Sequence, residues 1–219
     1  GNSTIEEIES NPYILVDIIQ NVDFKKIDKM ALDLGFSADN SKRVKSGIKF
    51  ALGRISINGN ACTLRQNLEK YVSELLGIDS DAVGSGLREL KQKDEIVIEN
   101  RDDEEWVYLK YFYNAELNIA RQLTILQEAR NIKKIDSFDN ELKKAERNID
   151  IELSEKQKDA LRQINENNVS IITGGPGTGK TTIIKTIIDI YKTKGKKVVL
   201  CAPTGRAAKR ITETTNEDA

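Results

Sequence analysis

The stretch Ser170–Thr182 reads SIITGGPGTGKTT and combines a short apolar run, a glycine-rich turn, a lysine and two threonines. From Gly174 to Thr181 the spacing is G-x-x-x-x-G-K-T, the pattern of a loop that binds phosphate groups. Glycines let the backbone turn tightly, so that several N–H groups converge on one anion. The stretch therefore predicts a strand, a phosphate-binding loop and a helix, in that order.

The residues of this loop have separate expected roles. We expect the nucleotide to contact Gly174, Gly175, Pro176, Gly177, Thr178, Gly179, Lys180, Thr181 and Thr182. Lys180 would add a positive charge near the β- and γ-phosphates, and the Thr181 hydroxyl is placed to ligate Mg²⁺. A helix beginning near Gly179 would point its free N–H groups at the same phosphates. Lys180 and Thr181 are thus the candidate catalytic residues, and Thr181 is the candidate metal ligand. The alternative is an ordinary glycine-rich turn.

The surroundings of the loop indicate an α/β domain of the P-loop NTPase type, which we place over residues 151–219. Ser154 is expected to cap a helix that runs through Ile164. The segments Val169–Thr173 and Lys197–Cys201 are expected to be strands joined by the helix after the loop. Such a βαβ unit implies parallel strand pairing.

Composition limits the remaining possibilities. The 219 residues suffice for one large or two ordinary domains, and the net charge of −1 confines any nucleic-acid contact to a local patch. The chain has no histidine, which excludes histidine-based catalysis and histidine metal sites. Cys62 and Cys201 lie far apart and suit two free thiols in a reducing compartment. No apolar run approaches ~18 residues, so we expect a cytoplasmic protein without a membrane partner.

Residues 1–60 are expected to form an α-helical segment that is helix-hairpin-helix-like. A helix is expected at residues 41–55, with one apolar face and one basic face. The basic face is made of Lys42, Arg43, Lys45, Lys49 and Arg54. Basic faces of this kind either contact a DNA backbone or are simply solvated. The hairpin at residues 21–24 has no glycine and adds a carboxylate, so a scaffolding role is an equal alternative to DNA binding.

Residues 61–131 are expected to be winged-helix-like, with two helices at 63–76 and 79–93 and a β-hairpin at 95–109. The turn of this hairpin is acidic from Asp102 to Glu105 and would repel duplex DNA, which favours protein contact or scaffolding. Residues 132–150 are charged and poorly patterned, and we expect a linker there.

Three segments in the second half, Leu153–Gln157, Gly174–Thr181 and Ala202–Ala208, resemble the Q-motif, motif I and motif Ia of superfamily 1 DNA helicases. The double glycine in GGPGTGKTT and the run APTGRAAKR are most similar to the RecD-like branch, the exodeoxyribonuclease V alpha-subunit family. In the first half, NPYILVDII and DFKKIDKMALDLG resemble the N-terminal helical region of stand-alone RecD-like helicases. The resemblance covers nearly the whole chain.

This resemblance implies a truncated RecA-like domain and an ATP-dependent helicase that moves 5′→3′ on single-stranded DNA. ATP and Mg²⁺ would be the cofactors, and the partners of the parent protein would be single-stranded DNA, single-strand/double-strand junctions and possible proteins of a repair complex. Gln157 would hydrogen-bond the adenine, and Pro203, Thr204 and Arg206 would contact the DNA strand.

The sequence departs from the family pattern in the glycine-free hairpin and in its end at Ala219, which precedes any second acidic Mg²⁺ site, water-positioning residue or arginine finger. We therefore expect an N-terminal fragment that binds nucleotide weakly, is inactive by itself and does not unwind DNA. Two alternatives stay open: a P-loop kinase or ATPase unrelated to DNA, and a protein-docking subunit of a nuclease–helicase complex.

Overall fold

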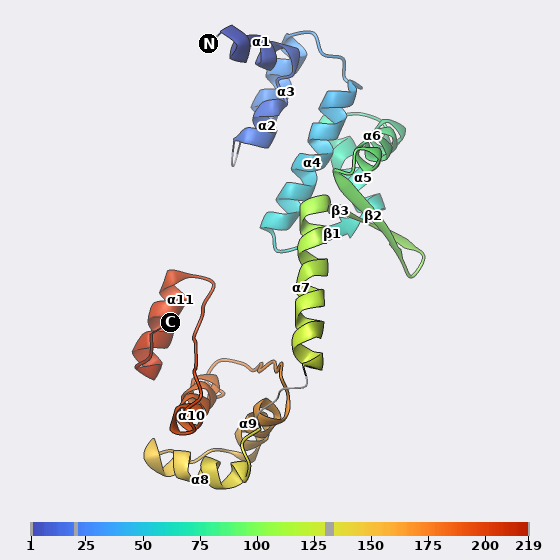
Figure 1. The fold of residues 1–219 in the computed structure, drawn as a ribbon. Coiled ribbons are helices and arrows are strands. Elements are labelled where there is room, and N and C mark those ends of the chain that lie inside the picture. The colour runs from blue at the N-terminus through green and yellow to red at the C-terminus, as the bar shows by residue number, and fades with distance from the viewer. Residues whose placement is uncertain (1, 20–21, 130–133, 219) are drawn as a thin grey trace. The chain divides into compact units, whose positions relative to one another are not determined.

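The chain divides into two compact units in the structure, a computed structural model that describes residues 2–19, 22–129 and 134–218. The first unit is Gly1–Ile119 and the second is Ala120–Ala219 (Figure 1). The boundary expected between residues 131 and 132 lies outside the described residues, so the domain limits stay a prediction.

The first unit is mostly helical with one small sheet. In chain order it contains α1 (Asn2–Ser10), α2 (Ile14–Ile18), α3 (Phe24–Asp33), α4 (Ser41–Ile57), β1 (Cys62–Leu64), α5 (Arg65–Leu76), α6 (Ser80–Gln92), β2 (Ile96–Arg101), β3 (Glu104–Leu109) and the start of α7 (Lys110–Glu128). The Asn40 side chain begins α4 by accepting a hydrogen bond from Lys42 N at 2.9 Å. At the end of α5, Gly77 adopts the left-handed conformation that helix C-termini favour.

The sheet is antiparallel, with the strand order β1-β3-β2. The β2–β3 hairpin turns through Asp102 and Asp103, which both have positive φ angles, of 50° and 64°. Two such residues form the tight turn whose twist matches that of the flanking strands. The expected order of two helices and a hairpin is therefore present as α5, α6 and β2–β3, and the winged-helix assignment stays a prediction.

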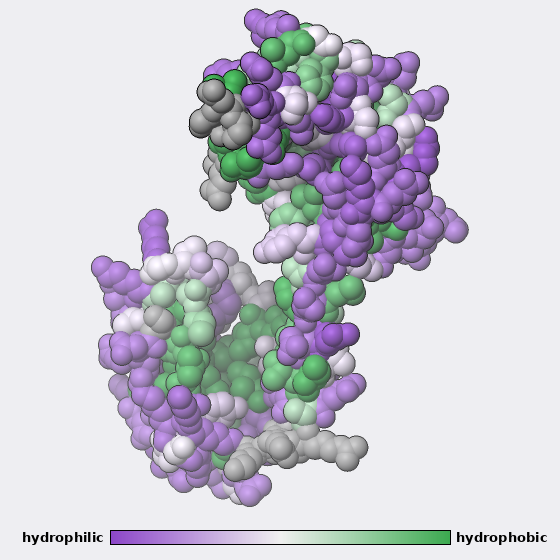
Figure 2. All heavy atoms as spheres, turned by 45° about the horizontal axis from the view of Figure 1, so that its top comes forward, coloured by the Kyte–Doolittle hydropathy of each residue, from purple (hydrophilic) through white to green (hydrophobic). Residues whose placement is uncertain are grey.

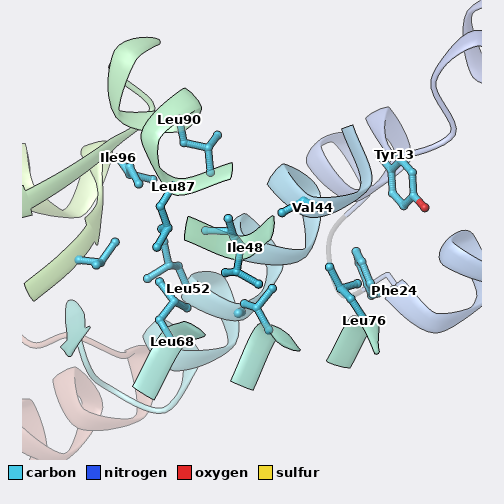
Figure 3. Close-up of a cluster of buried hydrophobic side chains, with 14 of the residues drawn as sticks. Tyr13, Phe24, Val44, Ile48, Leu52, Leu68, Leu76, Leu87, Leu90 and Ile96 are labelled. Atoms are coloured by element: carbon cyan, nitrogen blue, oxygen red, sulfur yellow. The ribbon is translucent and has the colours of Figure 1, made fainter. Parts of the chain in front are cut away.

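Helix α4 is the centre of the first core. Figure 3 shows Ile48 and Leu52 of α4 pointing toward Leu68 of α5 and Leu87 of α6, and all four are at most 2% exposed. Gly86 lets α6 approach α4 closely, because a Cβ atom there would lie 2.7 Å from Val44 Cγ1. Tight packing of this kind fixes how the helices cross.

A buried polar network links α3 to α4. Asp28 accepts hydrogen bonds from Arg43 Nε and Nη2 at 2.8 Å each and from Tyr13 Oη at 2.8 Å. Arg43 also donates to Leu76 O at 2.9 Å, which extends the network to the end of α5. Burial and, next, the hydrogen bond to Asp28 raise the pKa of the Tyr13 hydroxyl, which therefore stays a donor.

The prediction that α4 has an exposed basic face is only partly correct. Arg43 is buried at 4% exposure because it pairs with Asp28. Lys45 pairs with Glu89 at 2.8 Å, and Lys49 pairs with Asp17 at 2.9 Å and with Glu95 at 3.2 Å. Much of the positive charge on this helix is thus neutralised within the unit itself.

The second unit contains the end of α7, then α8 (Phe138–Asn148), α9 (Glu155–Glu166), α10 (Lys180–Thr193) and α11 (Gly205–Thr215). Its core includes Phe138, Leu142 and Ala145 of α8 and Leu161 of α9. The segment expected to be a linker thus contains a packed helix. Its apolar stripe at intervals of four and three residues is narrow, and the charged residues around it conceal it in the sequence.

The predicted βαβ unit is not formed within the described ranges. The segments 169–173 and 197–201 have no strand assignment, and the described sheet contains β1, β2 and β3 only. Ile171 is 90% exposed and Val199 is 71% exposed, which agrees with the absence of a sheet around them. Figure 2 shows hydrophobic atoms at the surface of this unit, in the lower part of the view. A strand needs a partner for its backbone N–H and C=O groups, and sequence pattern alone does not supply one.

Across residues 2–19, 22–129 and 134–218, none of the helices combines the length and the apolar character needed to cross a lipid bilayer.

Candidate nucleotide-binding site

A reciprocal cap fixes the start of α9, ahead of the phosphate loop. The Ser154 hydroxyl accepts from Gln157 N at 3.4 Å, and Gln157 Oε1 accepts from Ser154 N at 2.9 Å. The capping box gives the Ser154 N–H a side-chain acceptor and adds a second acceptor to the Gln157 N–H, which also donates to Ser154 O at 3.0 Å. The Ser154 backbone N–H, which donates to Oε1, sets the position of the Gln157 side-chain amide.

The residue before the cap is also held in place. Glu146 Oε1, on α8, accepts from Leu153 N at 2.9 Å and lies 3.2 Å from Lys158 Nζ. The Leu153 N–H is the main cause that lowers the pKa of Glu146, and Lys158 adds to it against the opposing effect of burial. At the other end of α9, Asn165 Oδ1 accepts from Ile135 N at 2.8 Å, and its Nδ2 donates to Ile135 O at 3.2 Å. Helix α9 is thereby anchored at both ends.

The phosphate loop turns at two glycines in the left-handed region. Gly177 has a φ angle of +74°, and Gly179, which precedes the first residue of α10, has +81°. Other residue types rarely adopt these angles, which explains the glycines at both positions. The Thr178 hydroxyl closes the turn by donating to Gly175 O at 2.9 Å.

Lys180 folds back over the loop. Its Nζ donates to Gly174 O and Gly175 O at 2.6 Å each and lies 3.4 Å from Thr178 Oγ1. The ammonium group therefore lies against the loop, beside the N-terminus of α10, where both positive charge and free N–H groups attract an anion. This donor set fits a triphosphate.

Thr181 is exposed, and its hydroxyl has no hydrogen-bond partner among residues 134–218 of its unit that the structure describes. It is free to ligate a cation. No group of three or more cysteine, aspartate or glutamate side chains in the described ranges is arranged to hold a metal ion. A cation here would rely on the hydroxyl of Thr181 together with oxygen atoms of a bound phosphate chain.

Gln157 reaches the loop directly. Its Nε2 donates to Thr178 O at 3.3 Å, so one amide joins the start of α9 to the last turn before α10. A Cβ atom at Gly179 would lie 2.2 Å from Gln157 Nε2, so this amide packs closely against the loop. The expected hydrogen bond between Gln157 and adenine stays a prediction.

The expected DNA-contacting residues lie at the start of α11. Thr204 caps that helix by accepting from Ala207 N at 3.2 Å, and Pro203 and Arg206 are exposed. In the described part of the second unit, no hydrogen bond links these three residues to the phosphate loop. The structure thus gives Thr204 a local structural role and leaves Arg206 accessible.

The double role of Gln157, as a capping partner and as a loop contact, was not predicted from the sequence. The pattern S-x-x-Q from Ser154 to Gln157 is the signal of a capping box and could have shown the first role. The contact with Thr178 joins positions 21 residues apart, and no local pattern indicates it.

Comparison with known proteins gives matches at both ends of the chain. Residues 1–62 match the family described as the ATP-dependent RecD2 DNA helicase HHH domain, and residues 157–219 match a family described as an AAA domain. An ATP-dependent RecD2 DNA helicase of Deinococcus radiodurans is 26% identical over all of this chain and 32% of the relative. A RecBCD enzyme subunit RecD of Buchnera aphidicola is 54% identical over 23% of this chain and 9% of the relative.

An uncharacterised protein of Methanocaldococcus jannaschii is 28% identical over 97% of this chain and 21% of the relative. The chain spans about a third of the length of the RecD2 relative. The RecD2 family model that matches residues 1–62 and the RecD2 and RecD relatives all name RecD-type proteins. The chain is therefore similar to proteins of the RecD-like helicase family.

Proposed function

We propose that this chain is the nucleotide-binding part of an ATP-dependent DNA helicase that moves 5′→3′ along single-stranded DNA. The observation that carries the proposal is the loop from Gly174 to Thr181, with Lys180 Nζ held against it and the N-terminus of α10 beside it. The RecD2 DNA helicase that matches the whole chain supports the DNA part of the proposal.

ATP with Mg²⁺ would supply the phosphoanhydride bond whose hydrolysis releases free energy for movement. Lys180 would exchange its contacts with Gly174 O and Gly175 O for phosphate oxygens, and the exposed Thr181 hydroxyl would ligate the cation. These residues bind and orient the nucleotide. We assign the activation of water and the unwinding of DNA to a longer protein that contains this chain, since neither Lys180 nor Thr181 positions a water molecule.

The start of α11 would contact the DNA strand. The Thr204 hydroxyl accepts from Ala207 N and keeps its own proton free to donate to a phosphate oxygen, and Arg206 is exposed in the first turn. Contacts to phosphate are independent of sequence and weaken as salt rises. Single-stranded DNA and single-strand/double-strand junctions are the substrates we propose.

The direct test is the affinity for Mg-ATP, measured by titration calorimetry. We expect Lys180→Ala to weaken binding about tenfold or more, because it removes the charged donor for the phosphates. Lys185→Ala is the matched control: it removes an exposed lysine from α10 that has no hydrogen bond or ion pair with a described residue, and it should leave affinity unchanged. Equal affinities for the two variants would contradict the nucleotide-binding proposal.

Coupling to DNA is tested in the longer protein. Its ATPase rate should rise when single-stranded DNA is added, and Arg206→Ala should reduce that stimulation while leaving Mg-ATP affinity unchanged. No stimulation would favour a P-loop kinase or ATPase that does not act on DNA.

One observation favours a second function for the first unit, protein docking or scaffolding. The pairing of Lys45 with Glu89 and of Lys49 with Asp17 and Glu95 removes positive charge that DNA would need. Titration of labelled single-stranded and forked DNA at low and high salt tests this. Lys25 and Lys29 are exposed lysines of α3 that could contact a DNA backbone. Salt-sensitive binding that Lys25→Glu and Lys29→Glu abolish would count against docking alone.

A further inference from the structure

We propose that Gln157 positions the phosphate loop itself: it holds the Thr178–Gly179 peptide so that the Gly179 N–H stays available to a phosphate. This inference rests on the proposed nucleotide-binding function and assigns Gln157 a part in binding the triphosphate that does not depend on the base. The contact that carries it is the 3.3 Å hydrogen bond from Gln157 Nε2 to Thr178 O.

The geometry of the peptide group gives the first step. A peptide unit is planar and trans, so its C=O and N–H groups point in opposite directions. When Thr178 O is held by Gln157 on α9, the Gly179 N–H must point away from α9. Rotation of this one peptide by half a turn would replace a donor for the phosphates with a carbonyl oxygen, which repels them.

The need for such a restraint follows from the residue type at 179. Gly179 has a φ angle of +81°, and glycine populates positive and negative φ with similar ease. The local backbone therefore does little to prevent the peptide from rotating. A side chain from another helix can supply the missing restraint, and Gln157 is the side chain that touches this turn.

Gln157 is itself well held for this purpose. Its Oε1 accepts from Ser154 N at 2.9 Å, so both ends of the amide are engaged, one by α9 and one by the loop. Glu146 fixes the preceding residue by accepting from Leu153 N at 2.9 Å. The restraint on the loop is thus continuous with the anchored start of α9.

The test uses a ligand without a base. Calorimetry with Mg²⁺ and inorganic tripolyphosphate is compared with Mg-ATP for the unaltered chain, Gln157→Met and Ser154→Ala. Gln157→Met keeps the size of the side chain and removes the donor to Thr178 O. Ser154→Ala removes half of the cap but keeps the backbone N–H that orients the Gln157 amide.

We expect Gln157→Met to weaken tripolyphosphate binding by about twofold to tenfold, the range for one neutral hydrogen bond, and Ser154→Ala to leave it unchanged. If Gln157→Met weakens ATP binding but binds tripolyphosphate like the unaltered chain, Gln157 contacts only the base, and the inference is overturned while the proposed function stands.

A ligand-free measurement keeps the two proposals separate. In the nucleotide-free protein, the ¹⁵N–¹H resonance of Gly179 should shift and broaden in Gln157→Met but not in Ser154→Ala, because the peptide becomes free to rotate. An unchanged Gly179 resonance in Gln157→Met would overturn the positioning role. Failure of the unaltered chain to bind either ligand would instead overturn the proposed function, and the Gly179 resonance would still decide the inference.

Discussion

Asp28 shows how much one buried side chain can contribute to the stability of the first unit. Asp28→Asn would leave the Arg43 guanidinium buried at 4% exposure without its charged partner. Breaking a buried pair from one side costs about 3–5 kcal/mol, and we expect the free energy of unfolding in urea to fall by that amount.

The matched control for Asp28 is a second aspartate paired across an exposed surface. Asp23 lies 3.7 Å from Lys26, with side chains 54% and 85% exposed, so Asp23→Asn should change stability by about 0–1 kcal/mol. Similar losses for both variants would mean that the Asp28 pair is solvated and that its burial has no energetic consequence.

The lowered pKa of Glu146 predicts that the second unit loses stability in acid. Its pKa is lowered in the folded state by the Leu153 N–H first and by Lys158, so the unfolded state binds its proton at a higher pH. The stabilisation is fully present above the unfolded value of about 4.3 and is lost as pH falls through the lower folded value. Glu146→Gln should therefore show a smaller fall in melting temperature than the unaltered chain between about pH 6 and about pH 3, as measured by circular dichroism. If the fall in melting temperature at low pH is the same in Glu146→Gln, this carboxylate is not a source of the acid sensitivity.

At the scale of elements, the α4–α6 contact depends on a glycine. Gly86→Ala would place a Cβ 2.7 Å from Val44 Cγ1 and 3.0 Å from Ile48 Cδ1, and overpacking of this kind costs about 1–3 kcal/mol. Gly84→Ala in the same helix meets nothing closer than 3.7 Å and should be neutral or stabilising by up to about 1 kcal/mol, through helix propensity. Chemical denaturation of both variants measures the difference, and equal stabilities would show that α6 can move away from α4 at little cost.

The elements that could be predicted from sequence are those whose cause is local. The turn with Gly177 and Gly179 follows from the residue types that the loop requires, and α4 from its apolar periodicity. The inward direction of Arg43 could not be predicted, since its partner Asp28 is on another helix and a basic stripe indicates a solvated face.

The prediction of strands on either side of α10 was wrong for a related reason. The apolar runs around Ile171 and Val199 indicate extended segments, but a strand is defined by its partner, and none lies beside them in the described residues. The contact of Gln157 with Thr178 is likewise tertiary and was not predictable from the pattern of either segment. The residue types of the loop thus predicted the loop itself, whereas the side-chain contacts that hold it could be identified only in the structure.

At the scale of the whole molecule, the two units have separate cores. The first core contains Leu87 and other residues between Tyr13 and Val107, and the second contains Leu161 and other residues between Ile135 and Ile190. Among residues 2–19, 22–129 and 134–218, the two cores share no residue, so we expect each core to lose packing on its own. The nucleotide site lies entirely in the second unit, so ligand binding should stabilise that unit first.

Native-state hydrogen exchange tests this independence, because it reports the stability of each unit separately. Leu87→Ala and Leu161→Ala each remove a leucine that is 0% exposed, and each should cost its own unit about 2–5 kcal/mol. Protection should fall in residues 22–109 for Leu87→Ala and in residues 135–191 for Leu161→Ala, with the other range unchanged. Mg-ATP should restore protection only in Leu161→Ala, since ligand binding adds its free energy to the unit that holds the site. An equal loss of protection in both ranges for either variant would show that the two units unfold as one.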